Sequence, residues 1–183
     1  MCLELYITKK EGEETIHADE IRKRALQVAD KDIVCYKTLM VRLNKGRILF
    51  LTPYRESKVM LGRNYCAENP TPFEVEYCCE DWLISVGGGY IHSFADREEA
   101  ALNILNWGEG EIVVKCIIPE GATYFEGRFD EDIAYASDKI IYTKEIVYIS
   151  EEIDDEIYGV LSFGGKCKEM LKAKYNCTNL VEI

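Results

Sequence analysis

Residues 87–149 carry the pattern that decides the fold: GGGYIHSFADREEAALNILNWGEGEIVVKCIIPEGATYFEGRFDEDIAYASDKIIYTKEIVYI. An apolar pair at residues 90–91 leads into a helical pattern from Asp96 to Trp107. Residues 112–118 follow as a continuous apolar run, and two further β-rich runs lie within residues 137–149. The predicted order is therefore strand, helix, strand, turn, strand.

The helix in this stretch has signals at both ends. Asp96 can accept hydrogen bonds from the free N–H groups of the first turn. Glu98 and Glu99 lie where the helix dipole favours negative charge, and Gly108 and Gly110 end the pattern. The buried face is marked by Ala100, Ala101, Ile104 and Leu105. These signals predict a helix that covers a sheet with its apolar side.

The apolar run at residues 112–118 is rich in β-branched side chains, so we predict a central strand that is buried on both faces. Pro119 cannot donate a ladder hydrogen bond and ends the strand, and Gly121 completes the turn. Polar and apolar residues mix over residues 122–136, where we predict a loop.

Outside this stretch, alternation, helical spacing and turn residues predict shorter elements. The predictions are strands at 3–8, 33–41, 47–51 and 73–77, helices at 18–29 and 168–175, and a hairpin loop at 44–46. Residues 55–72 are predicted to be irregular, and residues 80–86 fit no single type. We expect one α+β domain over residues 1–183, with a mainly antiparallel, split sheet and two or three flanking helices.

The composition is that of a globular chain, with 183 residues, 48% hydrophobic and 30% charged. No apolar run approaches the roughly 20 residues that a membrane helix needs. The segment from Met1 to Tyr6 lacks the basic and apolar regions of a signal peptide. We therefore expect a cytoplasmic protein without a membrane partner.

The net charge is −11, from 33 acidic and 22 basic residues. Nucleic-acid binding rests on neutralising phosphates, so this balance argues against a nucleic-acid partner. Eight cysteines without an export signal indicate thiols rather than a disulfide scaffold. With two histidines and no Cys-x-x-Cys spacing, we expect no metal site.

Three pieces resemble a known family. They are Val34 to Lys37 on an early strand, Gly89 to Phe94 before a helix, and Val114 to Gly121 followed by Ser137 to Ile141. This order resembles the ADP-ribosyltransferase-like fold of the Arg–Ser–Glu type, over residues 32–149. Most of the chain also resembles small proteins of phages and gut bacteria that begin Met-Cys-Leu and end in a similar Ile-Pro-x-Gly…Ala-Ser-Asp-x-Ile pattern.

The first resemblance implies a cleft that holds NAD, but the motif positions differ. Lys37 stands where the family has Arg, and it cannot make the planar two-pronged contact with phosphate. His92 and Ser93 stand in a Ser-Thr-Ser motif and keep one hydroxyl. Ser137 and Lys139 stand for two glutamates, the second of which the family uses to stabilise positive charge on the ribose.

The candidate ligand-binding residues are therefore Tyr36, Lys37, His92, Ser93 and Asp138. Three of them have a plainer structural alternative: His92 as a hydrogen-bonded structural histidine, Tyr36 as a core residue, and Asp138 as the cap of a turn. Adjacent strand residues point to opposite faces, so His92 and Ser93 are poorly placed to cooperate.

The leading hypothesis is a non-catalytic protein that binds a nucleotide or a protein partner in a degenerate cleft, with no obligatory cofactor. The alternative is an ADP-ribosyltransferase or NAD-cleaving enzyme with altered catalytic residues, which would use NAD. A third hypothesis is a structural or inhibitory protein of phage type that acts through its acidic surface.

Overall fold

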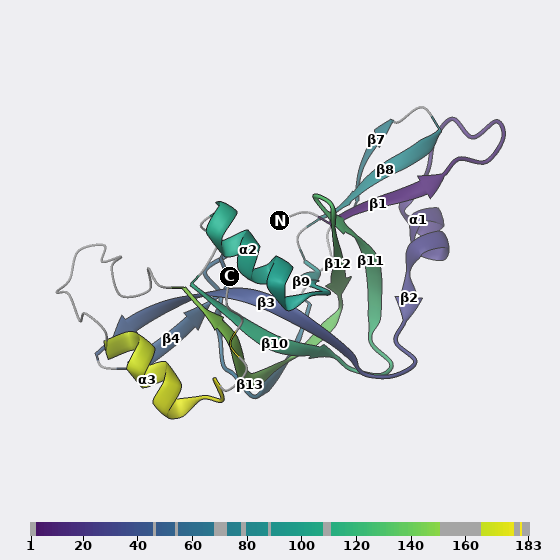
Figure 1. Ribbon diagram of the computed structural model, residues 1–183. Helices are drawn as coiled ribbons and strands as arrows, with labels where there is room; N and C mark the ends of the chain where they lie inside the picture. The colour runs from purple at the N-terminus through teal and green to yellow at the C-terminus, as the bar shows by residue number, and fades with distance from the viewer. Residues whose placement is uncertain are drawn as a thin grey trace. The chain divides into compact units, whose positions relative to one another are not determined.

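A computed structural model describes residues 3–45, 47–53, 55–67, 73–77, 80–87, 89–107, 111–150, 166–177 and 180 (Figure 1). Its helices are α1 (Ala18–Ala25), α2 (Arg97–Trp107) and α3 (Lys166–Lys174). Its strands are β1 (Leu3–Thr8), β2 (Gln27–Val28), β3 (Ile33–Asn44), β4 (Arg47–Leu51), β5 (Lys58–Val59), β6 (Arg63–Cys66), β7 (Glu74–Tyr77), β8 (Asp81–Val86), β9 (Ile91–Phe94), β10 (Ile112–Ile118), β11 (Thr123–Phe129), β12 (Asp132–Ser137) and β13 (Lys139–Ile149). The α+β class and the mainly antiparallel sheet are confirmed.

The chain forms two compact units, each assembled from three separated stretches. Unit 1 comprises Met1–Cys35, Asn64–Ala95 and Ile117–Ile141, and unit 2 comprises Tyr36–Arg63, Asp96–Cys116 and Tyr142–Ile183. Four of the five boundaries fall inside β3, β6, β10 and β13, and the fifth falls between β9 and α2. A single domain over residues 1–183 stays a prediction.

Unit 1 is an antiparallel sheet in the strand order β9-β12-β11-β1-β8-β7, with β2 beside β11 (Figure 1). Strand β1 alternates strictly, with Leu3, Leu5 and Ile7 buried. They share one face with the buried residues of β8, because Leu5 lies opposite Ile84 in the register. Helix α1 covers this face through Ile21. The core lies between the sheet and this helix.

The loop predicted over residues 122–136 is wrong, because β11 and β12 form a hairpin there. Their register runs from Tyr124 opposite Ser137 to Phe129 opposite Asp132. Asp130 has a positive φ of 54° at the turn, a conformation that Asp tolerates better than most residues. The buried side of the hairpin carries mainly small side chains, so its apolar signal is weak in the sequence.

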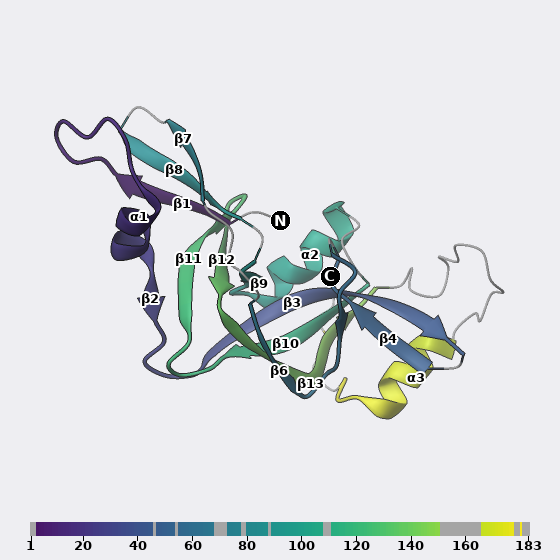
Figure 2. The ribbon, with the colours of Figure 1, turned by 180° about the vertical axis from the view of Figure 1, so that it is seen from behind.

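Unit 2 contains β10 between β13 and β3, with β4 on β3 and β5 on β4 (Figure 2). Ile112, Val113 and Val114 are fully buried, which confirms the predicted central strand. The β3–β4 hairpin closes at Asn44 opposite Arg47, as predicted. Gly46 within its loop lies outside the described residues.

The helix predictions have mixed outcomes. Helix α2 begins after Asp96, whose Oδ1 accepts from the N–H groups of Glu98 and Glu99 at 2.8 and 3.2 Å, as predicted. The helix predicted at 18–29 is too long, since α1 ends at Ala25 and Gln27–Val28 pair with β11 instead. The helix predicted at 168–175 corresponds to α3. Gly108 and Gly110 lie outside the described residues.

Two less readable stretches contain strands. Residues 80–86 fit no single type in the sequence, and they include β8, which pairs with β1 and β7. The stretch 55–72, predicted to be irregular, includes the short strands β5 and β6. Within the described part of the chain, no helix is both long and apolar enough to cross a bilayer.

Candidate functional site

The five predicted site residues are distributed over both units. Tyr36 and Lys37 lie in the part of β3 that belongs to unit 2. His92 and Ser93 lie on β9 in unit 1, and Asp138 joins β12 to β13 in the same unit. The surroundings of each residue are therefore described within its own unit.

His92 and Ser93 occupy opposite faces of β9, as the strand period requires. His92 lies opposite Ala136, which belongs to the core cluster of unit 1. Ser93 lies opposite Tyr135 and is fully buried. Since their side chains leave the strand in opposite directions, the pair cannot act as base and nucleophile on one substrate.

Asp138 binds the backbone at the start of β11. Its Oδ1 accepts from Thr123 N at 2.9 Å, and its own N–H donates to Thr123 O at 2.9 Å. Its carbonyl oxygen accepts from Ala67 N at 2.7 Å. The carboxylate therefore connects the junction of β12 and β13 to the start of β11.

Tyr36 is partly buried in unit 2, among charged groups of β10, β13 and α2. Burial raises the pKa of its phenol, and nearby Lys115 and Arg97 oppose that rise. Both cations are engaged: Lys115 Nζ lies 3.2 Å from Glu145 Oε2, and Arg97 Nε lies 2.9 Å from Glu98 Oε1. The charges near Tyr36 are thus balanced within unit 2.

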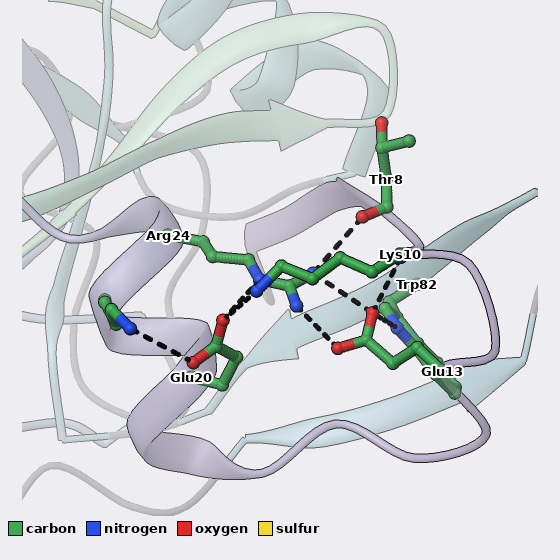
Figure 3. A network of polar contacts seen from close by, with 7 residues as sticks. Thr8, Lys10, Glu13, Glu20, Arg24 and Trp82 are labelled. Carbon is green, nitrogen blue, oxygen red and sulfur yellow. Dashed lines mark hydrogen bonds and ion pairs between the residues drawn. The ribbon is translucent and has the colours of Figure 1, made fainter.

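An ionic network that the sequence analysis missed joins the loop after β1 to α1 and β8 (Figure 3). Glu13 accepts from Arg24 Nη2 at 2.5 Å and from Trp82 Nε1 at 3.1 Å. Glu20 accepts from Lys10 Nζ at 2.6 Å and from Arg24 Nε at 2.9 Å. The side chains of Arg24 and Glu13 are only 15% and 13% exposed.

These contacts favour the ionised carboxylates. Hydrogen bonds, first from Arg24 and then from the N–H of Lys10, lower the pKa of Glu13 from 4.5 to about 2. The pKa of Glu20 is lowered to about 2, chiefly by hydrogen bonds from Lys10 and Arg24. Through these contacts the network holds α1 to the loop after β1 and to β8.

On the sheet face of unit 1 that points away from the core, residues of β7, β8, β1 and the adjoining parts of β11 and β12 form a surface, which we call the outer face. Tyr6 and Ile133 are 57% and 54% exposed on it. One row across the strands runs through Ile133, Arg128, Glu4, Ser85 and Glu74, and the next through Tyr6, Leu83 and Glu76. The alternation of residues 3–8 signals this face, but its neighbours on β7, β11 and β12 become visible only in the register.

Within the described ranges, no cluster of His, Cys, Asp or Glu could hold a metal ion. Comparison of the chain with protein-family models, with curated proteins and with solved structures finds no match.

Proposed function

We propose that this chain is a non-catalytic binding protein. The observation that supports it most is the position of Asp138, the acid nearest to the motif position of the ADP-ribosyltransferase resemblance. Its carboxylate already accepts the Thr123 N–H and holds the start of β11. It therefore has a structural use that competes with catalysis.

The chemistry of ADP-ribose transfer supports the same proposal. Positive charge grows on the ribose as the nicotinamide bond breaks, and catalysis needs a fixed negative group beside it. The motif positions hold Lys139, which is exposed, and Ser137, whose hydroxyl donates to Ile91 O at 3.4 Å. A lysine at that place would oppose the developing charge.

The partner proposed for the chain is a nucleotide or a protein, with no obligatory cofactor. A protein partner is favoured by the outer face of unit 1, where Tyr6 and Ile133 are more than half exposed. Both side chains lie on the same face of the sheet, where a partner could cover them.

The test is a pair of measurements on the purified chain. Labelled NAD is incubated with the chain, and both label transfer and nicotinamide release are followed. Thermal shifts with NAD and with nucleotides are recorded in parallel, because a ligand at 100 times its Kd adds about 2.7 kcal/mol to stability. We expect no turnover.

Asp138→Ala and Glu131→Ala form the matched pair for this test. Asp138→Ala should lower thermal stability, since the Thr123 N–H loses its acceptor at a cost of about 1–3 kcal/mol. Glu131 is exposed at the β11–β12 turn, so its replacement should change little. Turnover that disappears in Asp138→Ala and survives in Glu131→Ala would establish the enzyme instead.

A further inference from the structure

The outer face of unit 1 combines exposed apolar groups with one sign of charge. Strand alternation and register place five carboxylates and a single guanidinium on it. They are Glu4, Glu74, Glu76, Asp81, Glu126 and Arg128. Tyr6 lies among them, with Leu83 directly opposite on β8. Tyr6 and Leu83 thus form an aromatic and aliphatic patch that is surrounded by acidic side chains.

Three observations separate this face from the rest of unit 1. The opposite face of the same sheet carries the core cluster and is covered by α1. Tyr6 is 57% exposed although its neighbours Leu5 and Ile7 are buried. Ile133 on β12 is likewise exposed, although the next residue, Ala134, belongs to the core cluster. The exposed apolar side chains of the outer face therefore contribute little to the stability of the fold, which comes from the buried residues next to them in the strands.

We propose that the outer face is a docking surface for a basic protein segment that carries both cationic and aliphatic side chains. This inference rests on the proposed function, since it names the partner of a binding protein. Lysines or arginines of the segment would lie against Glu74, Glu76 and Glu4, and its aliphatic groups would cover Tyr6 and Leu83.

Charge complementarity selects this occupant over others. The carboxylates repel the phosphates of a nucleotide, a nucleic acid or an anionic lipid surface. A second copy of the chain, joined through a two-fold axis, would place the same acidic face against itself. A basic segment gains attraction at encounter from the same charges and buries aromatic area at the centre, where binding energy concentrates.

The probe is a short fluorescein-labelled peptide of lysines and leucines, compared with a second peptide in which glutamates replace the lysines. Binding is followed by fluorescence anisotropy at low and at high salt. We expect the lysine peptide to bind and to weaken as salt rises, because exposed charges are screened. The glutamate peptide should not bind.

Three variants of the full chain locate the site. Tyr6→Ser removes the exposed ring, and the pair Glu74→Lys with Glu76→Lys reverses charge on β7. Tyr6→Ser and the charge-reversed pair should each lower the affinity for the lysine peptide at least about tenfold. The control pair, Glu11→Lys with Glu14→Lys, makes the same change of net charge in the loop before α1 and should retain the affinity. Cooperative thermal unfolding of each variant verifies that it folds.

Two results would overturn the docking surface. One is an equal loss of affinity in the control pair, which would mean that the net charge of −11 alone attracts the peptide. The other is no binding of the lysine peptide by the unaltered chain. Neither result produces NAD turnover, so failure of this inference is distinguishable from failure of the non-catalytic proposal.

Discussion

Gly127 lies where β11 passes β1 at closest approach. A Cβ atom added there would meet the carbonyl oxygen of Glu4, and would lie 2.8 Å from Cδ2 of Leu5. The Glu4 oxygen is a backbone atom, and it cannot move aside as easily as the end of a flexible side chain. Glycine is therefore required at this position because β11 and β1 lie too close together for a Cβ atom, and not because of an unusual backbone angle.

Gly127→Ala should destabilise the chain by at least about 3 kcal/mol, since overpacking against backbone lies at the upper end of such costs. Gly12→Ala is the matched control. Gly12 has open space around its Cβ position and a φ of 75°, so only the left-handed backbone conformation is penalised, by about 1 kcal/mol. Urea unfolding of both variants measures the difference. Equal losses would show that β11 can move away from β1.

At this scale the sequence predicts residues whose role is local. Asp96 is recognisable as a helix cap because its partners lie two and three residues later. Gly127 has no such signal, because its constraint comes from Glu4, far away in the chain. Asp138 has no such local signal either, because its partner Thr123 lies 15 residues earlier.

At the scale of elements, the network of Glu13, Glu20 and Arg24 ties stability to pH. The pKa values of both carboxyl groups fall from 4.5 to about 2 in the folded chain. Their contribution is therefore complete above about 4.5 and is lost as the pH falls towards about 2. Glu13→Gln should destabilise the chain at neutral pH, and its difference from the unaltered chain should shrink below about pH 4.5.

Thermal unfolding over this pH range measures the effect. Glu14→Gln removes one negative charge at an exposed neighbouring position and serves as the control. A destabilisation by Glu13→Gln that keeps its size from neutral pH down to about pH 2 would contradict the coupling between this network and the fold.

Strand β10 offers a second test at this scale. Val114 is fully buried on a strand with neighbours on both edges. Val114→Asp should prevent folding, since an unpaired charge in such a place costs several kcal/mol. Val114→Ala, which leaves a cavity without a charge, should still fold with a loss of about 2 kcal/mol. A cooperatively melting Val114→Asp protein, detected by circular dichroism, would refute the burial of this strand.

The same contrast explains which elements could be predicted. The bounds of β10 follow from an uninterrupted apolar run that only a buried strand suits. The β11–β12 hairpin was not predicted, because its core positions Ala134, Ala136 and Gly127 contribute little hydrophobic signal. Helix α1 ends early because pairing of Gln27 and Val28 with β11 overrides the helical pattern.

For the whole molecule, the prediction that all eight cysteines are free thiols can be tested directly by chemical modification. Cys35, Cys66, Cys116, Cys167 and Cys177 are thiols among the described residues. Mass spectrometry after alkylation in denaturant should show eight modified thiols. Before denaturation Cys66 should react first among these five, because Cys35 and Cys116 are fully buried and burial raises the pKa of Cys177. Fewer than eight modified thiols would reveal disulfides.

The candidate site was less predictable than the fold. The five residues chosen from motifs lie in both units, and one of them, Asp138, binds the backbone at the start of β11. The outer face needed the register of five strands, of which the sequence analysis identified two, at residues 3–8 and 73–77.

The pairing of β1 has a consequence for synthesis on the ribosome. Residues 3–8 are synthesised before their partners, because they pair with residues 81–86 and, at Glu4, with Arg128. At about 5–20 residues per second, β8 follows β1 by roughly 4–16 s. For that time Leu3, Leu5 and Ile7 have no strand to pack beside. The nascent chain therefore carries an apolar segment at residues 3–8 that chaperones can bind until β8 has been made.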